Sequence, residues 1–348
     1  MQEGATYRLI SPDDSPALQA LIAATADSGS IGFTDEYRAD MLSVHRALAG
    51  DLHGAVAVCN GLTVGMALAD AHPVQVSGVV KTGAYLSHLR VQPDYQRRGI
   101  ARTLSEWGLK YLTELFGSEV VLYAAIMQGN LSLKLAGHFH FQSTGPIQGG
   151  VIPVRKRPPA RRPDLEVRQA RPAELAHIAD GMNRFYREHN LWSPVSADGL
   201  VEFLEKEVAG VQPNMLYVVA RGAEIVAGLS LSDCTELVRM RIARAPWYLR
   251  VLGGLLGVLP TSGVLRAMTA RRVWFDAGEL PAGRYLWQTL RFRMRDRADG
   301  LGIAYDPRDR LKDLFQVPVW IPMFPARYLV QLPGILESER LTYCLAGP

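Results

Sequence analysis

The spacing of apolar residues in the first half of the chain alternates between period two, typical of strands, and a period of about 3.6, typical of helices. The predicted order is strand, two helices, a hairpin, then strand, helix, strand and helix. These elements are expected at residues 7–10, 18–22, 36–49, 55–58, 64–69, 86–91, 100–104, 120–125 and 130–141. Asn60-Gly61 is a strong turn signal between the hairpin strands. This succession predicts an α/β (α+β mixed sheet) fold.

The same pattern begins again in the second half. Residues 165–175 repeat the strand, proline turn and helix of residues 7–13, and residues 216–229 repeat the hairpin. A repeat at a spacing of roughly 160 residues is too long for a solenoid and is typical of a duplicated domain. We therefore expect two tandem domains of one fold, residues 1–154 and residues 164–348.

A basic, proline-rich segment separates the two copies. Residues 155–163 read Arg-Lys-Arg-Pro-Pro-Ala-Arg-Arg-Pro, which is incompatible with a helix. We expect an extended, solvated interdomain linker, with a polyanion or nucleic-acid contact as the alternative.

Composition adds few constraints. The 348 residues are 48% hydrophobic and 21% charged, with a net charge of +4. Basic residues are interspersed with acidic ones, so we expect no nucleic-acid partner. Cys59, Cys234 and Cys344 lack metal-site spacing, so we expect free thiols and no metal. The first residues lack the pattern of a signal peptide, and we expect a cytoplasmic protein.

Residues 246–260 form the most apolar segment. The segment is bounded by prolines, carries Arg250 and is shorter than the about 20 residues that span a bilayer. We expect a buried or interface helix rather than a membrane-surface anchor, and no membrane partner.

Residues 86–104 combine an apolar strand end, a tight turn and the start of an amphipathic helix. The first N–H groups of a helix have no partner within the helix and carry partial positive charge, so an anionic diphosphate can bind there. Gly99 allows close backbone approach, and Ala101 keeps the next position small. The segment predicts a diphosphate site.

This segment resembles motif A of the GNAT-type N-acetyltransferases, whose pattern is Gln/Arg-x-x-Gly-x-Gly/Ala. Gln96, Gly99 and Ala101 occupy its three fixed positions. The resemblance implies two GNAT-like domains with separated central strands, and acetyl-CoA as co-substrate. It implies that the backbone of Leu89, Arg90 and Val91 binds the acetyl and pantetheine part.

The resemblance also assigns the diphosphate and one further contact. The diphosphate would be held by Arg97, Arg98, Gly99, Ile100, Ala101 and Arg102. Asn130 matches the family's pantetheine-contacting Asn, and it is equally suited to cap the following helix.

The family's acid and base are not found at their usual positions. Tyr85 and Ala125 stand where relatives carry a Glu, and the last helix has Gly137 or His138 where many carry a Tyr. Weak catalytic candidates are His88, Tyr85 and Ser87, and strand alternation would place His88 on the opposite face from the other two.

The second copy departs further from the motif. Its corresponding region, residues 273–286, keeps Gly283 but loses the Gln/Arg-x-x-Gly-x-Ala spacing, so we expect a degenerate cofactor site.

The leading hypothesis is an N-acetyltransferase acting on a primary amine of a small molecule or peptide, with a homodimer as the candidate assembly. One alternative is a non-catalytic acyl-CoA sensor or scaffold that recruits a partner through residues 247–259; another is an active second domain.

Overall fold

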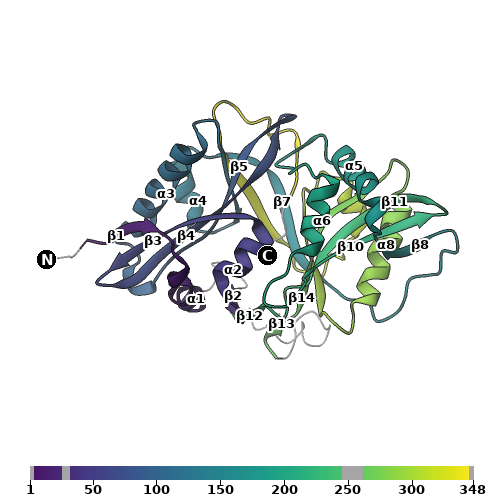
Figure 1. Ribbon diagram of the computed structural model, residues 1–348, viewed down its shortest axis with the longest axis horizontal. Coiled ribbons are helices and arrows are strands. Elements are labelled where there is room, and N and C mark those ends of the chain that lie inside the picture. Colours follow the sequence, from purple (N-terminus) through teal and green to yellow (C-terminus); the bar gives the residue numbers. More distant parts are fainter. Residues whose placement is uncertain (1–3, 26–31, 245–261, 345–348) are drawn as a thin grey trace.

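The computed structural model describes residues 4–25, 32–244 and 262–344 (Figure 1). The first half contains β1 (Thr6–Leu9), α1 (Ser15–Ala24), β2 (Gly32–Tyr37), α2 (Met41–Ala49), β3 (Asp51–Cys59), β4 (Leu62–Val76), β5 (Val79–Val91), α3 (Ile100–Phe116), β6 (Val121–Met127), α4 (Ser132–His138) and β7 (Gln142–Pro153). The second half contains β8 (Glu166–Gln169), α5 (Leu175–Phe185), β9 (His189–Asn190), α6 (Ala197–Glu205), β10 (Asn214–Arg221), β11 (Glu224–Ser232), β12 (Val238–Arg244), β13 (Val264–Leu265), β14 (Ala267–Phe275), α8 (Leu280–Arg293), β15 (Gly300–Tyr305), α9 (Leu311–Phe315), β16 (Phe324–Gln331) and β17 (Leu341–Thr342).

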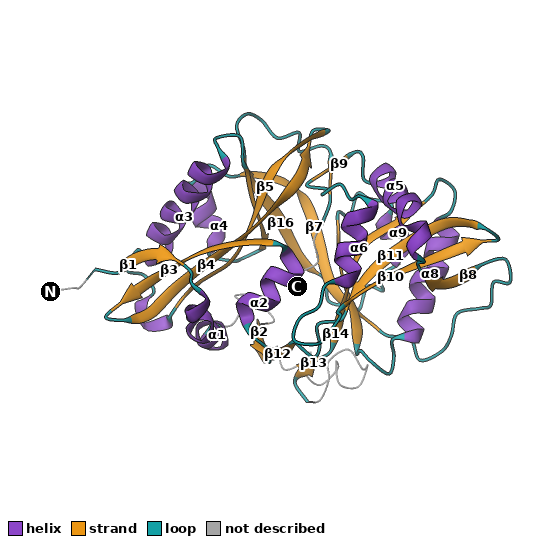
Figure 2. Cartoon of the chain, in the orientation of Figure 1, coloured by secondary structure: helices purple, strands orange, loops and turns teal. Residues whose placement is uncertain are grey.

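Twelve of the described strands form one large mixed sheet that runs through both halves (Figure 2). Its order is β1-β3-β4-β5-β6-β16-β7-β15-β14-β11-β10-β8. A smaller sheet, β13-β12-β2, also joins the halves, because β2 pairs with β12. The fold is therefore α/β with a mixed sheet, as the apolar spacing predicts.

The two halves exchange strands β7 and β16 within the large sheet. β16 lies between β6 and β7, and β7 lies between β16 and β15, with every neighbouring pair antiparallel. Each half thus completes its sheet with a strand of the other. The sequence gives no sign of this exchange, and the boundary predicted at residue 154 separates segments that the sheet holds together.

Helices cover both faces of the first half's sheet. Met66 and Leu68 of β4 pack against α1 and α2, whereas their neighbour Ala69 packs with Leu112 of α3 on the other face. Alternation along β4 therefore separates a face toward α1 and α2 from a face toward α3. The face of the sheet on which a side chain of the candidate site lies therefore determines which helices it can contact.

The helix expected at residues 36–49 is shorter than predicted. Glu36 and Tyr37 belong to strand β2, and α2 begins at Met41. The carboxylate of Asp40 accepts a hydrogen bond from Ser43 N at 2.7 Å and so caps the helix at that point. The pairing of β2 with β12 holds the preceding residues extended.

The structure describes the predicted linker but not the predicted apolar segment. Residues 155–163 contain no helix or strand, consistent with an extended linker. The apolar segment 246–260, including the proposed partner-recruiting residues 247–259, lies outside the described residues. Among the helices that are described, none has the length and apolar character needed to cross a bilayer.

Candidate functional site

The predicted diphosphate turn connects β5 to α3. After Val91 the chain forms a short 3-10 turn at Pro93–Tyr95 and enters the helix through Gly99, whose φ of 82° is left-handed. A Cβ built on Gly99 would meet no atom within 4 Å. The backbone at the start of α3 is therefore open to a ligand.

Six consecutive backbone amides have no protein acceptor at this turn. In the described structure none of the N–H groups of residues 97–102 donates to a protein acceptor, and the first helical bond runs from Thr103 N to Gly99 O at 3.0 Å. Gln96 Nε2 donates to Val91 O at 3.0 Å and ties the turn back to the strand. These donors lie at the positive end of a helix, which suits a diphosphate.

The side chains of the turn differ in position. Arg97 and Arg98 are exposed, with the Arg98 guanidinium 5.0 Å from the centre of the Tyr95 ring. Arg102 pairs with Glu106 at 2.9 Å. Ile100 is 6% exposed and packs with Ala57 and Val64. The buried Ile100 anchors the helix start, while the arginines are placed to add charge around the amides.

β5 and β6 diverge next to this turn. Their parallel pairing ends at Tyr85↔Tyr123, although β5 continues to Val91 and β6 to Met127. Leu89, Arg90 and Val91 therefore lie on the part of β5 that no longer pairs with β6. Unpaired strand edges of this kind offer backbone groups to an extended ligand.

Asn130 follows the end of β6. Its Oδ1 accepts a hydrogen bond at 2.9 Å from the N–H of Ser132, the first residue of α4, although Leu131 holds the cap position. Asn130 therefore contacts the start of α4 from one residue further out, and the pantetheine contact stays a prediction.

A bulge interrupts β5 beside the point of divergence. Met66 pairs with Arg90 and Leu68 with Ser87, so Ala67 faces two residues, and His88 has a φ of 52°. Nδ1 of His88 lies 3.1 Å from Oγ of Ser87. The expectation that His88 and Ser87 point to opposite faces was wrong, because the bulge breaks the alternation.

His88 lies against α2. The His45 and His88 rings meet edge to face with centroids 4.7 Å apart, and Nε2 of His45 is 2.9 Å from Oη of Tyr37. Burial lowers the pKa of His45 to about 4, and burial, then the nearby His45 and Arg90, hold the pKa of His88 well below its ordinary value. Both imidazoles are therefore neutral at pH 7.

Asp70 is a site residue that motif reasoning did not find. It pairs with Tyr85 across the β4–β5 hairpin and is 5% exposed. Burial raises the pKa of its carboxyl to about 7, and the Arg271 cation from the second half acts in the opposite direction. A lone acidic residue within the apolar run of β4 was the available signal.

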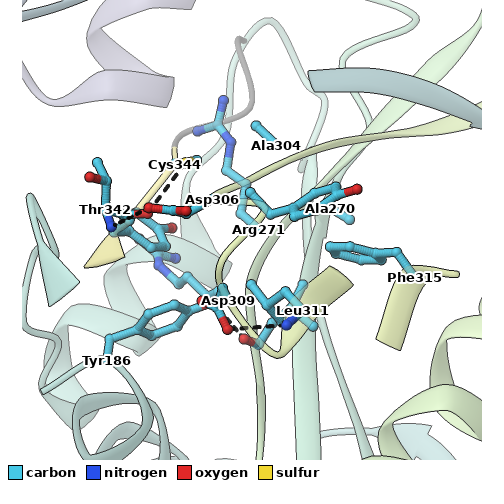
Figure 3. A pocket seen from close by; sticks show the side chains of 14 residues that line it. Tyr186, Ala270, Arg271, Ala304, Asp306, Asp309, Leu311, Phe315, Thr342 and Cys344 are labelled. Carbon is cyan, nitrogen blue, oxygen red and sulfur yellow. Dashed lines mark hydrogen bonds between the residues drawn. The ribbon is translucent and has the colours of Figure 1, made fainter. Parts of the chain in front are cut away.

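The second half has an equivalent region, and it is closed. The parallel pairing of β14 with β15 ends at Thr269↔Gly302, and the two strands diverge beyond this point. A small cavity remains there, lined by Tyr186, Asp306, Tyr343 and Cys344 among others (Figure 3). The segment that ends at Cys344 fills this divergence, because Thr342 N donates to Asp306 and Cys344 Sγ donates to Thr342 O.

The second half's turn is also acidic. Between β14 and α8 stand Asp276 and Glu279, whose carboxylates pair with Arg184 at 3.0 Å and Arg221 at 2.8 Å. Gly283, the retained glycine, lies inside α8 rather than at its start. Carboxylates at this turn would repel a diphosphate.

Among the described residues, no group of three or more His, Cys, Asp or Glu side chains is placed to hold a metal ion. Cys59, Cys234 and Cys344 form no disulfide with one another.

Comparison with known proteins agrees with this geometry. The acetyltransferase (GNAT) family model matches residues 19–137, which extend from α1 into α4. This part of the chain is a GNAT acetyltransferase domain, and the protein is an acyltransferase. No curated protein sequence matches the chain.

Solved structures share the fold over both halves. A GCN5-related N-acetyltransferase from Kribbella flavida aligns with a TM-score of 0.55 at 14% identity, covering 94% of this chain and 71% of that one. One from Sphaerobacter thermophilus aligns at 0.55 and 16% identity, covering 96% and 98%. N-myristoyltransferase from Saccharomyces cerevisiae, with bound myristoyl-CoA, aligns at 0.64 and 10% identity, covering 95% and 83%.

Proposed function

We propose that the protein transfers an acetyl group from acetyl-CoA to a primary amine, with the cofactor bound in the first half only. The observation that carries this proposal is the set of unpartnered amides at residues 97–102 beside the divergence of β5 and β6. The diphosphate would be held by these amides, with Arg97, Arg98 and Arg102 nearby, and the pantetheine would extend along Leu89–Val91 toward Asn130.

The reaction needs an uncharged amine nitrogen. Its lone pair attacks the thioester carbon, the C–N bond forms and the C–S bond breaks, and CoA leaves as a thiolate that takes up a proton. Holding the amine against the thioester supplies much of the rate. Ser87, His88 and Tyr85 line the strand beside the expected acyl position and remain candidates for contact with the reacting groups.

In this proposal the second half stabilises the fold and binds no cofactor. Its divergence is filled by the segment ending at Cys344, and its turn carries Asp276 and Glu279. The acceptor is a small molecule or a peptide.

Two glycines at opposite ends of α3 provide a matched test. Gly99 and Gly117 have φ values of 82° and 86°, and a Cβ at either meets no atom within 4 Å. Gly99→Glu and Gly117→Glu add equal charge, and Gly117→Glu carries the larger backbone strain, because a φ of 86° with a ψ of 168° suits glycine alone. We expect CoA binding and thiol release with a panel of amines to fall by about 100-fold or more in Gly99→Glu alone.

Three results would contradict this proposal. Equal losses in both variants would assign the effect to helix strain and reject the diphosphate site. Undiminished turnover in Gly99→Glu would place the active cofactor site elsewhere. CoA binding by the native protein without thiol release would favour the sensor.

A further inference from the structure

Three side chains form a row across the sheet at the last pairing before β5 and β6 diverge. Asp70 of β4 pairs with Tyr85 of β5, and Tyr85 pairs with Tyr123 of β6. Directly paired residues share a face of a sheet, and the Tyr85 and Tyr123 ring centroids are 5.4 Å apart. Asp70 alternates with Ala69, which faces α3, so the row lies on the opposite face.

One oxygen of the Asp70 carboxyl is buried without a hydrogen-bond partner. Asp70 is 5% exposed, and its Oδ1 has no partner in the described structure. Folded proteins rarely leave a buried carboxyl oxygen unpaired, because desolvation costs free energy that a hydrogen bond would offset. A group kept in this condition is suited to accept a proton from a ligand.

The groups that act on Asp70 come from several elements. Arg271 of β14 is the cation that opposes the effect of burial. Tyr37 of β2, Tyr85 of β5 and Tyr123 of β6 each experience the Asp70 charge. On its own strand, the His72 side chain bonds to the Asp70 backbone. Arg271 belongs to β14 in the second half, so charged groups from both halves of the chain act on this carboxyl.

We infer that Asp70 accepts the proton of the acceptor's ammonium group, and that Arg271 of the second half tunes its affinity for that proton. The inference rests on the proposed acetyl transfer and identifies its acceptor as an amine that arrives protonated.

The steps balance in atoms and charge. One ammonium proton passes to the Asp70 carboxylate and frees the nitrogen lone pair. The nitrogen attacks the thioester carbon, the C–N bond forms and the C–S bond breaks. The nitrogen's second proton passes to the thiolate sulfur, and Asp70 returns its proton to water. An amide, free CoA thiol and one proton result.

The first test compares Asp70→Asn with Asp51→Asn, an exposed carboxylate of the same sheet. We expect Asp70→Asn to lower kcat/KM at pH 7 by about 100-fold or more while CoA affinity stays unchanged. The loss should shrink at higher pH, where the amine is deprotonated in solution. Asp51→Asn should match the native protein. As a second variant, Asp70→Ala should regain activity when formate is added.

The second test follows the pH profile of Arg271→Gln. Removing the cation should move the rising limb of kcat/KM to higher pH while leaving the plateau intact. A merely structural role for Arg271 would lower the rate at every pH without moving the midpoint, and would reject the tuning role.

Failure of the Asp70 role and failure of the proposed acetyl transfer would give different results. Native turnover together with an unchanged rate and pH profile in Asp70→Asn would overturn the role of Asp70 and leave acetyl transfer standing. Absence of thiol release by the native protein with every amine would overturn both.

Discussion

Arg8 and Arg168 occupy equivalent places in the two halves and make the same two-armed contact with a carboxylate. Arg8 donates to both oxygens of Asp14 at 2.7 Å, and Arg168 donates to those of Glu174 at 2.8 and 2.6 Å. Each carboxylate also accepts a backbone N–H three residues before it. The two pairs fasten the first strand of each half to its first helix.

We predict that both pairs contribute comparably to stability. Asp14→Asn or Glu174→Gln should lower the free energy of unfolding by about 1–3 kcal/mol, because a guanidinium loses its charged partner. Urea unfolding measures the change, with the exposed Asp13→Asn as control. A loss at one pair only would contradict their equivalence.

The exchanged strands predict that the halves do not fold separately. A fragment of residues 1–163 lacks β16 and leaves β6 and β7 without their shared neighbour. Such open edges aggregate, so we expect an insoluble or unfolded fragment. Adding residues 164–348 during refolding should restore a sheet, as measured by circular dichroism and gel filtration. A soluble, CoA-binding first fragment would contradict the exchange.

Neutral His45 predicts destabilisation in acid. Its pKa is lowered from 6.5 to about 4 in the folded chain, so the unfolded chain binds more protons in this interval. Stability is fully present above pH 6.5 and falls by up to about 3 kcal/mol as pH drops toward 4. His45→Gln should flatten this decline in urea titrations, whereas the exposed His140→Gln should leave it unchanged.

The raised pKa of Asp70 predicts that stability changes with pH in the opposite direction. A pKa raised to about 7 favours the protonated carboxyl in the folded state, so its contribution is present below pH 4 and lost as pH rises through 7. Asp70→Asn should therefore stabilise the protein at pH 8 by up to about 4 kcal/mol and have little effect at pH 4. Equal melting temperatures at pH 8 would show that the carboxylate is paired or solvated.

The strand, turn and helix start around Gly99 could be predicted because these parts are adjacent in the chain. The strand end, Gly99 and the helix start at Ile100 lie within a few residues, and local backbone rules determine their arrangement. The repeat could be detected for the same reason, since Arg8 and Arg168 each stand in a short strand before a proline turn.

Asp70 and the strand exchange depend on distant pairing. Asp70 reaches Tyr85 only through the register of the β4–β5 hairpin, which begins at Ser77-Gly78, and apolar spacing does not specify that register. The composition of β16 does not indicate that this strand pairs with β6 of the first half rather than with β15 of its own half. The bulge at His88 was likewise hidden, because a positive φ at a non-glycine residue leaves no clear signal.

Hydrogen exchange of the native protein with and without CoA tests the central claim most directly. We predict that CoA protects the amides of residues 97–102, which have no protein acceptor in the described structure, and leaves residues 276–282 of the second half unchanged. Protection at residues 276–282, or unchanged exchange at 97–102 with CoA bound, would contradict the account.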